Sequence, residues 1–114
     1  MESAEYKTLV TCNSSLVSLL KPCVLGIAEE LFGLHIISDS TREFVRDANC
    51  LDKEKSSKLV SVVQDRTKRH QHIFYKFLDV IDQEQYLQDL VSDLKETLCK
   101  ILLRCIMSMY YFTC

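Results

Sequence analysis

The most apolar stretch of the chain, IFYKFLDVI at residues 73–81, carries polar residues along a single line only. The polar positions are His72, Lys76, Asp79 and Gln83. Their spacing of four, three and four residues places them on one side of an α-helix. A helix that is polar along one line and apolar elsewhere needs other helices around it. The pattern therefore predicts that residues 73–81 form the central helix of a bundle.

Apolar periodicity predicts two further helices in the N-terminal third. Residues 4–20 have helical spacing, with Ser3 as the expected N-cap, but TCNSS at residues 11–15 interrupts them. Short hydroxyl and amide side chains compete with the helix for backbone hydrogen bonds, so we expect a bent or split first helix. Pro22 suits the first position of a second helix. The exposed line of that helix is expected at Gly26, Glu29, Glu30 and Gly33.

Helix starts in the rest of the chain are predicted from capping motifs. Ser40 with Glu43 fits a capping box for a short third helix that ends near Ala48. Asp52 is expected to cap the fourth helix, and Asp82 with Gln85 fits a second capping box before the last helix. The apolar stripe of the last helix continues past residue 98 without Gly or Pro, so the helix is expected to continue with it.

Composition supports this architecture. A length of 114 residues favours one domain, and 47% hydrophobic residues with only two Gly and one Pro favour helices with short connections. We therefore predict an all-α fold of six helices. The domain is placed at residues 4–98, followed by an apolar C-terminal extension at residues 99–114 that continues the last helix.

Neither catalysis nor a cofactor is predicted. No nucleophile, base and orienting group occur together in a convincing pattern, so the chain is not expected to be an enzyme. The six cysteines include no CxxC and match no zinc spacing. A zinc site assembled from distant cysteine and histidine residues is the remaining alternative. Because no secretory signal is present, we expect reduced thiols and a cytoplasmic location.

Charge is segregated along the chain. Residues 1–51 carry four bases and seven acids, net −3, whereas residues 52–70 carry six bases and three acids, net +3. Such sectors suit a protein partner or a second copy better than nucleic acid, which needs a broad basic face. Lys55 and Arg66 lie in line with the apolar stripe, so other residues are the candidates for partner binding. These are Lys53, Lys58 and Lys68 on the basic side and Glu29, Glu30, Asp39, Glu43 and Asp47 on the acidic side.

The order of these patterns resembles a caspase recruitment domain (CARD) over residues 4–98. The run LVSLLKPCVLGIAEELFGLHIISDSTREFV resembles the first three helices of that family. KSSKLVSVVQDRTKRHQHIFYKFLDVI resembles the fourth and fifth helices, with Phe-x-x-Phe at Phe74 and Phe77, and YLQDLVSDL resembles the last. One departure is the turn at residues 65–69, which reads DRTKR where such domains often have Lys-Gly.

The resemblance implies a six-helix antiparallel death fold with Greek-key order and no catalysis. It also implies homotypic association with another CARD-containing protein (a caspase, adaptor or receptor), or with itself, in apoptotic or innate-immune signalling. In that family a basic face on helices one and four meets an acidic face on helices two and three. Here the basic face maps onto Lys7, Lys53 and Lys58. The acidic face maps onto Glu29, Glu30, Asp39 and Glu43.

The tail, residues 98–114, permits three interpretations. It packs back on the bundle, docks a partner helix, or lies at a membrane surface through Tyr110, Tyr111 and Phe112. We rank the first two equally and the third below them, and the tail is too short to span a membrane. An alternative function follows from the heptad spacing of the 87–109 stripe, which suits a coiled-coil oligomerisation module. The seam consists of Leu87, Val91, Leu94, Leu98, Ile101 and Cys105.

Overall fold

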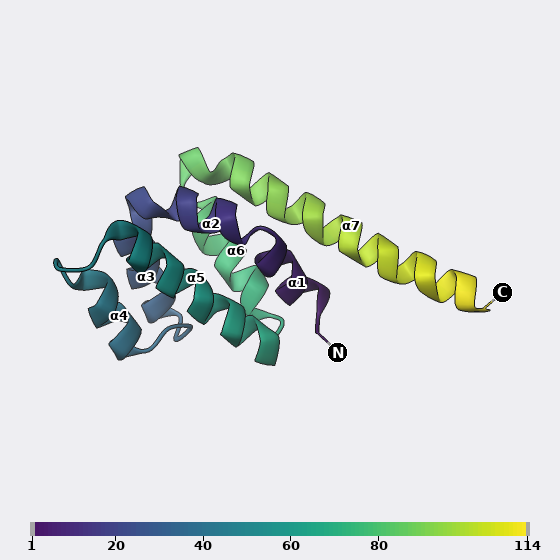
Figure 1. Ribbon diagram of the computed structural model, residues 1–114, viewed down its shortest axis with the longest axis horizontal. Helices are drawn as coiled ribbons and strands as arrows, with labels where there is room; N and C mark the ends of the chain where they lie inside the picture. The colour runs from purple at the N-terminus through teal and green to yellow at the C-terminus, as the bar shows by residue number, and fades with distance from the viewer. Residues whose placement is uncertain (1, 114) are drawn as a thin grey trace.

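The computed structural model describes the backbone of residues 2–113 and the side chains of residues 2–104, and no strand occurs in that range. Its α-helices are α1 (Ala4–Thr11), α2 (Asn13–Leu20), α3 (Val24–Gly33), α4 (Asp39–Arg46), α5 (Asp52–Arg69), α6 (Ile73–Asp82) and α7 (Gln88–Thr113). Two 3₁₀ turns, η1 (Lys21–Cys23) and η2 (Gln85–Leu87), precede α3 and α7. With α1 and α2 as one interrupted helix, the predicted all-α six-helix bundle is confirmed (Figure 1).

The first helix is split at the predicted polar stretch. Ser3 caps α1, with its Oγ accepting a hydrogen bond from the Tyr6 N–H at 3.2 Å. Cys12 ends α1 with φ −94° and ψ 13°, outside the helical range, and α2 begins at the next residue. Pro22 lies in the 3₁₀ turn η1 and not at the first position of α3, so the second helix begins two residues later than predicted.

Three of the four predicted caps are wrong. The N-cap of α4 is Ser38 and not Ser40: its Oγ accepts a hydrogen bond from the Thr41 N–H at 3.3 Å. Ile36 and Ile37, which precede Ser38, are buried in the core and fix where the chain enters the helix. Ser38 has the extended backbone of an N-cap, with ψ 167°. The helix therefore begins at Asp39, and Ser40 lies inside its first turn.

The starts of α5 and α7 also differ from the prediction. Asp52 is the first residue of α5, after Leu51 at the N-cap, which makes no side-chain cap. Asp82 and Gln85 form no capping box among the described side chains. Instead Gln88 Nε2 donates to the carbonyl oxygens of Asp82 at 2.7 Å and Glu84 at 3.3 Å, which satisfies backbone acceptors at the end of α6.

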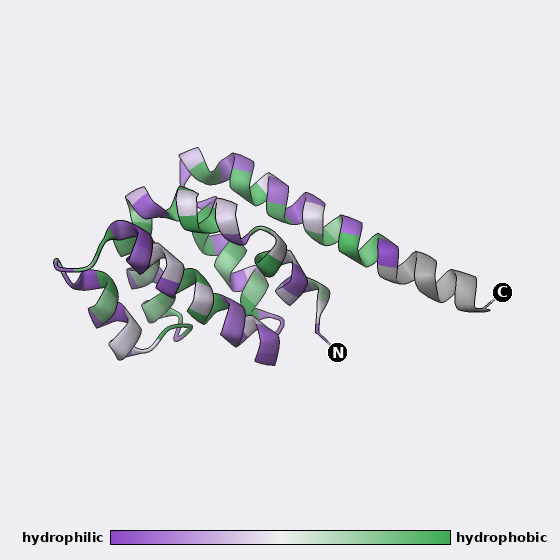
Figure 2. Ribbon diagram, in the orientation of Figure 1, coloured by the Kyte–Doolittle hydropathy of each residue, from purple (hydrophilic) through white to green (hydrophobic). Residues whose placement is uncertain are grey.

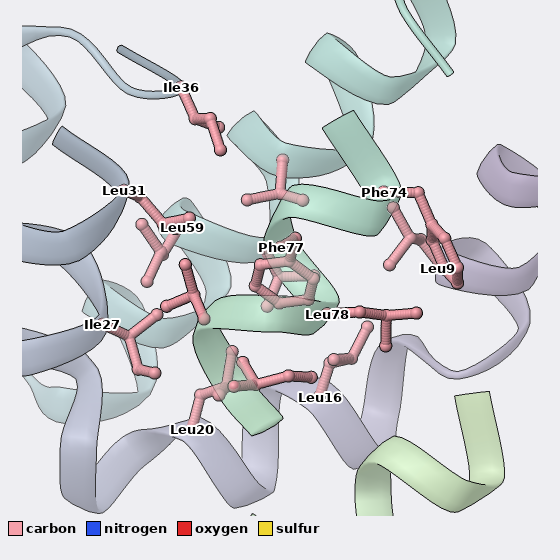
Figure 3. Packing of buried hydrophobic residues seen from close by; sticks show 14 of the residues in the cluster. Leu9, Leu16, Leu20, Ile27, Leu31, Ile36, Leu59, Phe74, Phe77 and Leu78 are labelled. Atoms are coloured by element: carbon pink, nitrogen blue, oxygen red, sulfur yellow. The ribbon is translucent and has the colours of Figure 1, made fainter. Parts of the chain in front are cut away.

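The core is built around the apolar faces of α6. Phe74 and Phe77 are fully buried, and Figure 3 shows Phe77 among side chains of α3 and α5, with Phe74 beside Leu9 of α1. Lys76 and Asp79 on the predicted polar line are exposed, and Tyr75 is exposed next to them. The prediction of α6 as a deeply buried helix is confirmed.

α5 shares the central position with α6, which the pattern did not predict. It packs against α1, α2, α3, α4 and α6. Its buried face includes Leu59, Val60 and Val63 but also polar residues, so the face is wider than its apolar stripe. Ser56, fully buried, donates from Oγ to the Val17 carbonyl oxygen of α2 at 2.6 Å. Lys55 is buried, as expected from its place in line with the stripe.

α7 is longer than the bundle that it covers. Leu87 of η2 and Leu90 and Leu94 of α7 are fully buried, and α1 packs along α7. Past residue 98 the cover ends: Ile101 is half-buried, and Leu102 and Leu103 are exposed. Within residues 99–104, Ile101 and Arg104 line a cleft against α1 while Leu102 and Leu103 stay exposed, and α7 extends beyond the bundle (Figures 1 and 2). The side chains of Cys105, Met109, Tyr110, Tyr111 and Phe112 lie outside the described residues. No described helix has the length and hydropathy needed to cross a membrane.

The N-cap of α4 yields a direct test. Replacing Ser38 with Ala removes the acceptor for the Thr41 N–H and should lower the free energy of unfolding by about 1 kcal/mol. Ser40→Ala is the matched control, because this exposed side chain makes no described hydrogen bond, and it should change stability by less than about 0.5 kcal/mol. Urea unfolding monitored by circular dichroism measures both. A larger loss for Ser40→Ala would restore the predicted capping box.

The C-terminus of α3 yields a second test. The Ile36 N–H donates to the Leu31 carbonyl and the His35 N–H to the Phe32 carbonyl, which is a Schellman motif with His35 at the left-handed position, φ 62°. Glycine adopts this conformation without strain, so His35→Gly should stabilise the protein by about 0.5–1 kcal/mol. Thermal unfolding should show the gain. His70→Gly, at an extended residue with φ −138°, should give none.

Candidate interaction surfaces

The structure brings the five predicted acidic residues onto one pair of neighbouring helices. Glu29 and Glu30 lie on α3, Asp39 and Glu43 on α4, and Asp47 directly after α4, and all five side chains are exposed. We call this set the acidic surface. Its residues lie together because α3 and α4 pack against each other through their apolar sides.

Two arginines of α4, which the sequence prediction missed, partly neutralise the acidic surface. Glu29 Oε1 accepts hydrogen bonds from Arg42 Nε at 3.2 Å and from Arg46 Nε at 2.9 Å, and Arg46 Nη2 lies 2.6 Å from the same oxygen. Arg42 also lies 4.4 Å from the centre of the Phe32 ring, which fixes its guanidinium by a cation–π contact. Five acids and two arginines leave a net charge of −3 on this surface.

The acidic residues differ in how far they are engaged within the molecule. Asp39 and Glu43 lie 3.9 and 4.0 Å from the arginines, at the limit of an ion pair. Asp47 stabilises the turn after α4, because its Oδ1 accepts a hydrogen bond from the Asn49 N–H at 2.9 Å. Glu30 forms no ion pair with the side chains that the structure describes. It is therefore the acidic residue best placed to meet a partner.

Glu30 also lines a shallow groove on α3. The groove consists of Gly26, Glu29, Glu30, Gly33 and Leu34. A Cβ added at either glycine would meet no atom within 4 Å, so the bundle itself does not require glycine at these positions. The exposed helix backbone lets an approaching surface come close to the Glu30 carboxylate.

The second charged surface is basic. Lys53 and Lys58 lie together on it, in the N-terminal half of α5. Lys53 lines a groove between α2 and α5 whose other residues are Asn13, Ser14, Val17, Ser18, Lys21 and Ser57. Ser57 and Lys53 also border the adjoining hollow, which includes Glu54, Lys58 and Ser61. We call Lys21, Lys53 and Lys58 with these serines the basic groove. Lys21 belongs to it although the sequence prediction omitted it, because the α2–α5 packing that places it there is long-range.

Lys68 and Lys7 are not part of the basic groove. Lys68 lies ten residues after Lys58, about 15 Å further along α5, and its Nζ is 5.6 Å from the centre of the Tyr6 ring. Lys7 lines a different cleft, between α1 and α7, together with Arg104. The four predicted basic residues thus fall on two separate parts of the molecule.

The thiols and the phenol with shifted pKa values are weak nucleophiles. Burial raises the pKa of the Cys23 thiol, and burial followed by the charges of Asp47 and Glu54 raises the pKa of Cys50. Burial and a hydrogen bond with Cys23 raise the pKa of Tyr86 to about 12. Among the described side chains, no three His, Cys, Asp or Glu residues lie close enough together to hold a metal ion. The charged surfaces are thus the best candidates for a function.

Comparisons of the chain with protein-family models, with curated proteins and with solved structures find no match. The CARD resemblance therefore rests on the order of apolar positions and on the helix lengths. The interaction surfaces rest on the positions of the exposed charges.

The contacts of Glu29 with Arg42 and Arg46, which we call the Glu29 clamp, lead to a testable prediction about the Glu29 pKa. The hydrogen bond from Arg42, and after it that from Arg46, holds the pKa of the Glu29 carboxyl below its usual range despite some burial. Since the folded-state pKa is lowered, the clamp stabilises the fold above about pH 4.3 and this contribution is lost as the pH falls through the lowered pKa. NMR titration of the side-chain carboxyl should show a higher Glu29 pKa in Arg42→Gln. Arg69→Gln, which alters a pair with Asp65, should leave it unchanged.

Proposed function

We propose that this chain is a non-catalytic interaction module that binds its partner by apposition of the basic groove and the acidic surface. The supporting observation is that exposed charges of opposite sign lie on different helix pairs of one bundle, α2–α5 and α3–α4. Each surface keeps a charge that no described ion pair neutralises, Lys58 on one and Glu30 on the other. Such pairs favour encounter with a partner of complementary charge.

The CARD resemblance supports a more specific form of this proposal. The partner is then another CARD-containing protein or a second copy, and the association is homotypic, in cytoplasmic apoptotic or innate-immune signalling. Since one chain carries both surfaces, copies join head to tail, and a heterologous contact that does not close on itself extends into a filament. Screening by salt weakens such a contact, because the charges concerned are exposed.

A second candidate function uses α7 as an oligomerisation helix. The observation that favours it is the exposure of Leu102 and Leu103 beyond the bundle. The first part of the predicted heptad seam, from Leu87 to Leu98, is buried inside the bundle, so an intermolecular seam begins only at Ile101. Association through this seam would be apolar and therefore insensitive to salt.

Charge reversal separates the two candidates. Lys58→Glu and Glu30→Lys should each reduce self-association of the full chain at low salt by at least about tenfold, since each places like charges opposite each other. An equimolar mixture of the two variants should recover association, because the reversed residues then face a complementary surface. Sedimentation velocity measures the assembly size, and circular dichroism checks that helicity and melting temperature are unchanged.

Lys76→Glu on α6 is the matched control, an equally exposed lysine remote from both surfaces, and it should associate like the wild type. Association that survives both reversals would remove the charged surfaces from the account. Loss in Leu103→Glu with no effect of Lys58→Glu would favour the α7 seam instead.

A further inference from the structure

Exposed apolar side chains also lie where α1 meets α7 past residue 98. Leu102 and Leu103 are 40% and 57% exposed, and Val10 of α1 is 46% exposed. Between α1 and α7 lies an open cleft of about 490 Å³ lined by Tyr6, Lys7, Val10, Ile101 and Arg104, with Glu2 and Thr11. Apolar and cationic side chains thus share one surface.

The apolar character of α7 in this region extends around the helix. Ile101, Leu102 and Leu103 are consecutive, so at 100° per residue they cover more than half of its circumference. One neighbouring helix covers only one side of such a segment, so Leu102 and Leu103 stay exposed although Ile101 lines the cleft with α1.

Either a second copy of the chain or a membrane could cover this apolar surface, and its charge distinguishes between the two. Lys7 and Arg104 line the cleft with one acid, Glu2, and Lys100 forms an ion pair with Glu96 at 3.2 Å, so the cleft keeps an excess of one positive charge. The same surface of a second copy would meet this excess with an excess of the same sign. A bilayer with anionic headgroups supplies an apolar layer and negative charge together.

We propose that this end of the molecule binds the surface of an anionic membrane, with Leu102 and Leu103 entering the boundary between headgroups and acyl chains and Lys7 and Arg104 meeting the headgroups. Lys100 and Arg104 flank Leu102 and Leu103 and stay at the level of the headgroups, so the proposed contact is interfacial. It leaves the basic groove and the acidic surface, which lie on other helices, free to bind a protein partner.

The test is flotation of the full chain with phosphatidylcholine vesicles, with or without about 30 mol% phosphatidylserine. The wild type should bind the anionic vesicles at least about tenfold more tightly than the neutral ones, and salt at about 0.5 M should remove most of the difference. Leu103→Glu should reduce binding by at least about tenfold, as should Arg104→Glu. The controls are Leu51→Glu, at a leucine that is 68% exposed in the loop before α5, and Lys76→Glu, and both should bind like the wild type.

Three outcomes would overturn the proposal. The first is absence of binding to anionic vesicles, and the second is equal binding to neutral ones. The third is loss of self-association, and not of vesicle binding, in Leu103→Glu, which would identify a second copy as the occupant. Lys58→Glu should leave vesicle binding intact, so failure of this proposal and failure of the charge-mediated association give different results.

Discussion

The fold depends on one constraint, the burial of α6. Phe74, Phe77 and Ile81 must be removed from water on almost every side of a ten-residue helix. α3, α5 and α7 provide that cover, and α1 and α2 close the bundle over α5 and α7. A fully buried phenylalanine contributes about 3–5 kcal/mol relative to alanine, so these contacts outweigh any single surface interaction described above. The burial of α6 therefore determines which faces of the other helices remain exposed.

Some charged side chains are buried or paired within the bundle, and others remain exposed on the two charged surfaces. Lys55 is buried and Glu29 is held by Arg42 and Arg46, so neither is free for a partner. Lys58 and Glu30 are exposed, and they lie on different helices, α5 and α3. The two proposed partner surfaces thus use charges that the fold itself does not require. They lie away from the α1–α7 cleft, so the proposed protein association and the proposed membrane contact use different parts of the molecule.

Periodicity predicted most of the buried positions and the continuation of α7, because burial repeats with the helical turn. It was wrong at Leu25 of α3 and at Leu34, the C-cap of that helix, which were expected on the packed face and are exposed. Local motifs failed where two of them competed: Ser38 and Ser40 both fit an N-cap, and the burial of Ile37 decided between them. The Glu29 clamp was missed because its partners are 13 and 17 residues away in the sequence, although Arg42 and Arg46, four apart, share one face of a helix. Lys7 was predicted to lie on the same basic face as Lys58. The order of helices along the chain does not show how far apart two residues lie in the fold.

The most direct test of the account is light scattering of the full wild-type chain during a salt titration from about 0.05 M to about 0.5 M. Head-to-tail contact between the basic groove and the acidic surface predicts large assemblies at low salt that dissolve as the Debye length shortens, with no change in helicity. A chain that stays monomeric at low salt, or assemblies that persist unchanged at high salt, would contradict the central claim that charge mediates its association.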